Sequence, residues 1–170
     1  TCKTDRVWVR DSGPIFLKDK KNNILLSNWN FNAWAKYKNF GNDNKINSKI
    51  SKINKYEILD IIYKKKPVTL EGGSIDVNGE GLLLTTRECL LSKIQERNPG
   101  LSIKDYAIIF EKILGIKKII WLEKGISGDD THGHVDDVAR FVSKNKVFLA
   151  FEGNKKDKNY KNLKKNLDIL

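Results

Sequence analysis

Three carboxylates stand just ahead of three similar segments of this chain. Asp11 precedes PIFLKDKKNNILLSNW, Glu71 precedes GGSIDVNGEGLLLTT, and Asp136 precedes DVARFVSKNKVFLAF. Each segment has the pattern of a strand, a turn and a second strand. Such self-similarity predicts a pseudo-symmetric α/β ring in which equivalent strand ends bring the three carboxylates into one pocket. Buried carboxylates need cations, and a planar guanidinium or a metal ion is the usual partner.

A histidine and a carboxylate are two residues apart in THGHVDD, namely His134 and Asp136. In an extended segment both side chains would point to the same side. Histidine titrates near neutral pH, so the pair suits a general acid–base beside a substrate-holding carboxylate. An isolated H-x-D pair is more often structural, and this one gains weight from the other motifs.

The other two carboxylates also have suggestive neighbours. Trp8 lies three residues before Asp11, and an indole face with a carboxylate can form a clamp for a cation. The alternative is a buried strand tryptophan and an aspartate that forms a turn. Glu71 precedes Gly72 and Gly73, where the backbone can approach a ligand closely, or which can form a glycine bulge.

Four motifs together resemble a known family. WVRDSGP, LEGGSI, the GEGLLLTTRECLLS segment with its following RNP, and THGHVDDVARF are similar in order and spacing to the agmatine deiminase and bacterial peptidyl-arginine deiminase family. The resemblance implies a pentein fold, an α/β propeller of ββα-type units. On this basis residues 1–170 form a single incomplete deiminase domain that covers about three of the five units.

The resemblance also implies a reaction and the roles of the site residues. Asp11 and Asp136 would grip a guanidinium, Trp8 would line the pocket, and Glu71 and His134 match the catalytic acidic residue and histidine. A cysteine nucleophile would convert agmatine and water to N-carbamoylputrescine and ammonia, or peptidyl-arginine to peptidyl-citrulline. Trp8 close to Asp11 fits the agmatine deiminase branch of the family. The resemblance therefore favours agmatine as the substrate and a role in putrescine biosynthesis. No cofactor or metal is implied.

The nucleophile expected from the family is missing from this chain. Family members carry it in a G-G-G-N-I-H-C-like motif near the C-terminus, and no such motif occurs here. Cys2 and Cys89 stand in other contexts, and Cys89 is expected to be a small buried hydrophobe. We therefore expect this polypeptide alone to be inactive and to need a complementing C-terminal segment.

Two alternatives remain open. The chain could be a non-catalytic guanidinium- or polyamine-binding fragment, or half of a split enzyme, because Tyr160, Leu163, Leu167 and Leu170 form a helical stripe that needs an apolar partner. A zinc-dependent hydrolase is less favoured. It would use His132, His134 and Asp136 as zinc ligands, but His132 and His134 are the only histidines in the chain.

Composition limits the partners. The 170 residues carry a net charge of +11, yet only 5 of the 32 basic residues are arginines and the lysines are spread along the chain. This distribution favours a solvated lysine surface over a nucleic-acid interface. No apolar run is long enough to cross a bilayer, so we expect no membrane partner and a cytoplasmic location.

Periodicity predicts the elements around the motifs. We expect strands at 6–10, 14–18, 24–29, 68–77, 81–86, 117–123, 139–143 and 146–152, and helices over 46–63, over 102–114 and in the tail from 160.

Overall fold

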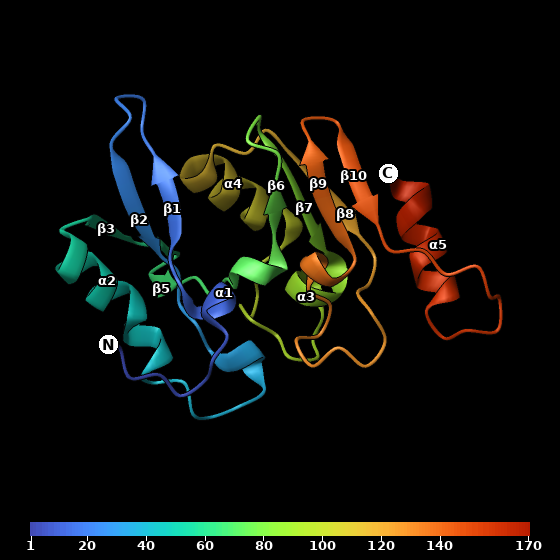
Figure 1. The fold of residues 1–170 in the computed structure, drawn as a ribbon, viewed down its shortest axis with the longest axis horizontal. Helices are drawn as coiled ribbons and strands as arrows, with labels where there is room; N and C mark the ends of the chain where they lie inside the picture. Colours follow the sequence, from blue (N-terminus) through green and yellow to red (C-terminus); the bar gives the residue numbers. More distant parts are fainter. The chain divides into compact units, whose positions relative to one another are not determined.

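The computed structural model describes residues 1–170, which pack as two compact units, Thr1–Gly72 and Gly73–Leu170. Each unit contains an open three-stranded sheet built in the same way. An antiparallel hairpin comes first, and a third strand then runs parallel to the second strand of the hairpin. The fold is therefore mixed α/β, as predicted, and none of its sheets closes on itself (Figure 1).

In the first unit the sheet consists of β1 (Ile15–Lys18), β2 (Ile24–Asn28) and β3 (Glu57–Asp60). Helix α2 (Ile46–Asn54) connects β2 to β3 and packs against both strands (Figure 1). Such a helical crossover is the usual connection between parallel strands. The shorter elements are α1 (Val9–Ser12), η1 (Ala33–Ala35), η2 (Asp43–Lys45), β4 (Ile62–Tyr63) and β5 (Lys66–Pro67).

Two predictions in this unit are wrong. Residues 6–10 do not form a strand, because the backbone N–H groups of Asp5 and Arg6 donate to the buried Asp43 carboxylate and the following residues turn into α1. The helix predicted over 46–63 ends at Asn54, with Lys55 in the left-handed conformation. Residues 57–60 then pair with β2, so strand pairing overrides the helical spacing of the isoleucines.

In the second unit the sheet consists of β6 (Asp76–Val77), β7 (Leu82–Thr86) and β8 (Lys118–Leu122). Helices α3 (Arg87–Leu91) and α4 (Ile103–Leu114) connect β7 to β8. A second hairpin, β9 (Ala139–Ser143) and β10 (Lys146–Leu149), follows, and α5 (Tyr160–Ile169) ends the chain. Two 3-10 turns, η3 (Gly72–Ser74) and η4 (Val135–Asp137), precede β6 and β9. The strand predicted over 68–77 is thus reduced to β6.

Helix α4 agrees with its prediction at both ends. Ser102 and Asp105 form a capping box at its start, and Gly115 adopts the left-handed conformation at its end. Its buried side chains include Tyr106 and Phe110, and the Tyr106 ring meets the ring of Trp121 in β8 edge to face at 6.1 Å. The helix therefore covers the sheet of the second unit.

Helix α5 has one buried side and one exposed side. Leu163 joins the core cluster formed around Leu84 and Leu122. The buried Asn166 accepts the Glu123 N–H and donates to the Lys124 carbonyl, which fixes the helix at the end of β8. The predicted stripe is thus only partly covered, because Leu167 and Leu170 are 44% and 47% exposed.

Candidate functional site

The three carboxylates occupy equivalent positions in the chain, as the sequence pattern predicted. Asp11 lies in α1, ahead of the hairpin β1–β2. Glu71 directly precedes η3 and the hairpin β6–β7. Asp136 lies in η4, ahead of the hairpin β9–β10. In each case the carboxylate lies in or directly before a short helical turn that precedes two antiparallel strands.

Asp11 is buried in the first unit and is held from two directions. Its own N–H donates to the Trp8 carbonyl within the turn, and the Trp34 indole N–H donates to its Oδ2 at 3.0 Å. The Asp11 and Trp34 residues are only 5% and 4% exposed. Trp8 itself is 60% exposed, which contradicts the alternative of a buried strand tryptophan.

Glu71 is fully buried and lies near the end of the first unit. The glycine that follows it, Gly72, packs against the turn that carries Asp11. A Cβ added to Gly72 would lie 2.2 Å from the Arg10 carbonyl oxygen. The glycine thus permits a close approach between two backbone segments, which carry Glu71 and Asp11, the two candidate site carboxylates of this unit.

His134 is buried in the second unit, 3% exposed, and its Nδ1 lies 3.9 Å from Asp136 Oδ1. The prediction that the pair occupies an extended segment is wrong, because η4 begins directly after His134. The tight turn nevertheless keeps the two side chains adjacent. An imidazole beside a carboxylate retains the geometry expected of a proton-transferring group with a charged neighbour.

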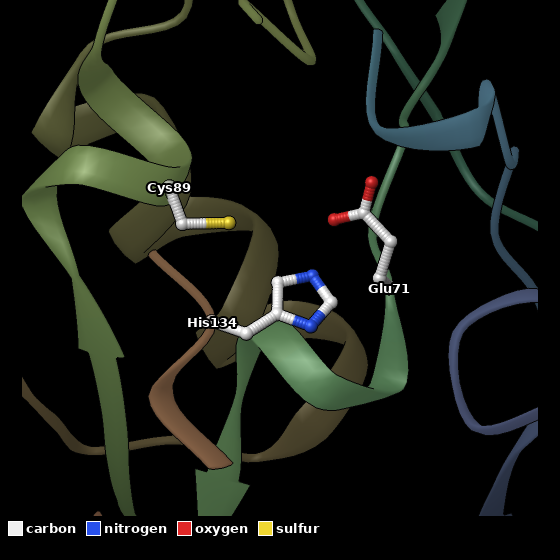
Figure 2. Close-up of side chains that lie close together, drawn as sticks. All are labelled: Glu71, Cys89 and His134. Carbon is white, nitrogen blue, oxygen red and sulfur yellow. The ribbon is translucent and has the colours of Figure 1, made fainter. Parts of the chain in front are cut away.

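A thiol stands beside this histidine. Figure 2 shows Cys89 and His134 with the sulfur facing the ring, and the Sγ and a ring nitrogen lie within 4.8 Å of each other. Thr86, which caps α3, links the two segments: it accepts the Cys89 N–H at 3.0 Å and donates to the Gly133 carbonyl at 2.5 Å. The predicted burial of Cys89 is confirmed, but its position beside His134 was not foreseen. Glu71, the third residue drawn, belongs to the first unit.

The backbone before His134 is anchored at several points. Asp129 accepts the N–H groups of Thr131, Gly133 and His134. Burial alone would raise the pKa of Asp129, but these hydrogen bonds outweigh it and hold the pKa below its usual range. The buried Arg97 donates to the Thr131 carbonyl. The loop is therefore a rigid support for the histidine.

Two neighbouring groups have shifted protonation equilibria. Burial raises the pKa of Asp137, and the nearby Asp129 and Asp136 carboxylates raise it further. Burial and the neighbouring carboxylates therefore favour the neutral form of Asp137.

Burial lowers the pKa of His132, against the opposing effect of the Glu88 carboxylate. The His132 Nε2 lies 3.1 Å from Ser92 Oγ, and His132 does not share with His134 and Asp136 a set of ligand atoms close enough to hold one metal ion. The arrangement needed for the zinc alternative is therefore not formed.

Several supporting residues could not be recognised from the sequence. Trp34 and Asp129 contact Asp11 and His134, and Arg97 contacts Thr131 in the loop that precedes His134. The only available signal was the glycine- and aspartate-rich composition of residues 125–137, which is typical of functional loops.

Comparisons with known proteins identify the family of the chain. The whole chain, residues 1–170, matches the sequence profile of the Porphyromonas-type peptidyl-arginine deiminases. A relative from Latilactobacillus sakei is 40% identical over 171 residues, which cover 96% of this chain and 44% of the relative. An agmatine deiminase from Pseudomonas fluorescens is 36% identical over 172 residues, covering 98% of this chain and 45% of that protein.

Solved structures give the same result. A C. jejuni agmatine deiminase with substrate bound superimposes with a TM-score of 0.87 at 35% identity, covering 99% of this chain and 49% of that one. The fold of this chain is thus shared with solved agmatine deiminases. The chain belongs to the Porphyromonas-type peptidyl-arginine deiminase family, and it spans less than half the length of the curated relatives named above.

Proposed function

We propose that this chain is part of a guanidine-hydrolysing deiminase that converts agmatine and water to N-carbamoylputrescine and ammonia. The observation that carries the proposal is the family match over all 170 residues. The assignment of Asp11, Glu71, His134 and Asp136 to the active site rests on the resemblance of their motifs. The relative from P. fluorescens is named agmatine deiminase, and the C. jejuni structure of that name contains substrate. Peptidyl-arginine is the alternative substrate, because it has the same guanidinium end.

The proposed mechanism assigns one task to each residue. Asp11 and Asp136 accept hydrogen bonds from the guanidinium and keep it charged, which makes its carbon electrophilic. A cysteine thiolate outside this chain adds to that carbon, and His134 protonates the departing ammonia. The covalent adduct is then hydrolysed to the ureido product by a water that His134 deprotonates.

Glu71 and Trp8 complete the proposed site. Glu71 is the second catalytic acidic residue, and its full burial in the structure would strengthen its interaction with any cation. Trp8, whose ring is largely exposed, lines the substrate pocket through its aromatic face.

We also propose that both units belong to one incomplete pentein domain. The support is a repeated order of elements: a short helical turn next to a carboxylate precedes β1, β6 and β9, and in each case a hairpin and then a helix follow. Under this proposal a complementing C-terminal segment supplies the remaining repeats and the nucleophile.

The test compares agmatine binding with turnover. We expect the 170-residue chain to bind agmatine in calorimetry without releasing ammonia, and to gain turnover when the complementing segment is supplied. The Asp11→Asn substitution should weaken binding about tenfold or more, because it removes a charge-assisted hydrogen bond. Asp19→Asn, in the exposed turn between β1 and β2, is the matched control.

Three results would change the proposal. Robust ammonia release by the chain alone would refute the missing nucleophile. Binding of arginine peptides in preference to agmatine would change the substrate, and no binding of either would refute the proposed function.

A second candidate is a non-catalytic guanidinium-binding fragment or half of a split enzyme. Leu167 in α5 and Leu170 directly after it are half-exposed, which favours a partner for this helix. Size-exclusion chromatography separates the two cases, since a monodisperse monomer would argue against a split protein.

None of the helices combines the length and apolar character needed to cross a membrane.

A further inference from the structure

Residues Ala33–Ala35 adopt a conformation that L-amino acids avoid. Three successive residues, none of them glycine, have positive φ angles of 50°, 59° and 51°. Each such residue costs about 1–2 kcal/mol relative to the right-handed conformation. Backbone strain of this kind persists only where the surroundings enforce it, and it is concentrated at functional positions.

The surroundings of this left-handed turn do enforce it. The Asn32 side chain accepts the Ala35 N–H at 2.9 Å, and Ala33 is completely buried. The consequence is the placement of Trp34, whose buried indole N–H donates to Asp11 Oδ2 at 3.0 Å. Hydrogen bonds to a buried charged group are among the stronger ones in proteins.

The indole is also fixed around its ring. The rings of Phe31 and Tyr37 meet it edge to face, at 5.4 Å and 6.0 Å between centroids. The Arg6 guanidinium lies over the Trp34 ring at 5.6 Å and over the Tyr37 ring at 4.1 Å. A cation over an aromatic face is attracted by the ring quadrupole and restricts the tilt of the ring.

Arg6 is in turn held in place. Its guanidinium donates to Asn39 at 2.6 Å, and its backbone N–H donates to the buried Asp43 carboxylate at 3.2 Å. A chain of contacts thus runs from Asp43 through Arg6 and Trp34 to Asp11. All of these residues lie within the first unit.

We propose that Trp34 is a positioning residue for the Asp11 carboxylate, and that the left-handed turn exists to deliver its indole N–H. The indole does not ionise in the working pH range, so it is a constant donor that fixes the rotation of the carboxylate plane. A guanidinium pairs through parallel hydrogen bonds and therefore needs a carboxylate in a defined plane. This last step rests on the proposed function of Asp11; the contact between Trp34 and Asp11 does not.

The experiment combines two readouts on the 170-residue chain. The first is the 19F signal of 5-fluorotryptophan at position 34, followed while the pH is lowered. It should titrate with the Asp11 carboxyl group, and the titration should vanish in Asp11→Asn. Because this readout keeps an indole with its N–H at position 34, it holds even where a Trp34→Phe substitution prevents folding.

The second readout is agmatine affinity in Trp34→Phe, which keeps an aromatic ring but removes the N–H donor. We expect affinity to fall about tenfold. Trp29→Phe is the matched control, because Trp29 is equally buried in the same unit but its indole N–H donates to the uncharged Ser27 hydroxyl at 2.9 Å. It should change affinity less than about twofold.

Each outcome decides the inference. A Trp34 signal that ignores Asp11, or equal affinity losses in the two phenylalanine variants, would overturn it. If the wild-type chain binds no agmatine, the proposed function of the site fails, and the 19F titration alone then decides whether Trp34 holds Asp11.

Discussion

Substituting Gly133 by alanine tests how tightly the backbone before His134 is packed. Gly133 has a φ of +95°, and an added Cβ would lie 3.0 Å from the Cβ, Cγ and Oε2 atoms of Glu88. Glu88 cannot easily move away, because its Oε2 accepts the Gly125 N–H at 3.0 Å. We expect about 1–2 kcal/mol of destabilisation from the positive φ and about 1–3 kcal/mol more from overpacking.

The matched control is Gly100→Ala in the same unit. Gly100 has a similar φ of +86°, but an added Cβ would meet no atom within 4 Å. This variant should show only the conformational cost of about 1–2 kcal/mol. Hydrogen exchange of the β7 and β8 amides reports the stability of the second unit and should separate the two variants by about 1–3 kcal/mol. Equal losses would refute the argument, since they would mean that Glu88 yields without cost.

Two further predictions concern the anchors of the site. Gly72→Ala should destabilise the first unit by about 2 kcal/mol or more in denaturant unfolding, because the added Cβ would lie 2.2 Å from the Arg10 carbonyl oxygen. Gly41→Ala is the control and should leave the stability unchanged, because its added Cβ would meet no atom within 4 Å. The pKa of Asp129 is lower in the folded state than in the unfolded state. The ionised carboxylate therefore stabilises the folded protein above the unfolded-state pKa of about 3.9, and this stabilisation is lost as the pH falls through the lower folded-state pKa. Asp129→Asn should therefore reduce the loss of stability on acidification below about pH 4, and an unchanged acid transition would contradict this.

The sequence predicted the repeated units better than it predicted their details. Local signals were sufficient for α4, whose start at Ser102 and end at Gly115 follow from capping chemistry. The alternating patterns around 139–149 were sufficient for the third hairpin. The helix predicted over 46–63 was too long, because the parallel pairing of β3 with β2 is a contact between distant segments that periodicity does not reveal.

The candidate site shows the same division between local and distant information. The positions of Asp11 and His134 ahead of their hairpins could be predicted, because turn and strand signals are local. Their supports could not be predicted: the indole that bonds Asp11 lies 23 residues away, and the hydroxyl that bonds the Gly133 carbonyl lies 47 residues away. Nothing in the spacing of a lone tryptophan or threonine distinguishes such a support from an ordinary core residue.

This division explains how a repeated fold can hold an asymmetric site. The repeat supplies the same carboxylate turn before each hairpin, so symmetry alone would give three similar environments. The supports differ in chemistry: an indole N–H at Asp11 and a backbone contact at Gly72 beside Glu71. At Asp136 the neighbours are an imidazole and further carboxylates. Carboxylates in different environments hold their protons and partners differently. Under the proposed function, such differences would let one carboxylate bind a guanidinium while another group transfers protons.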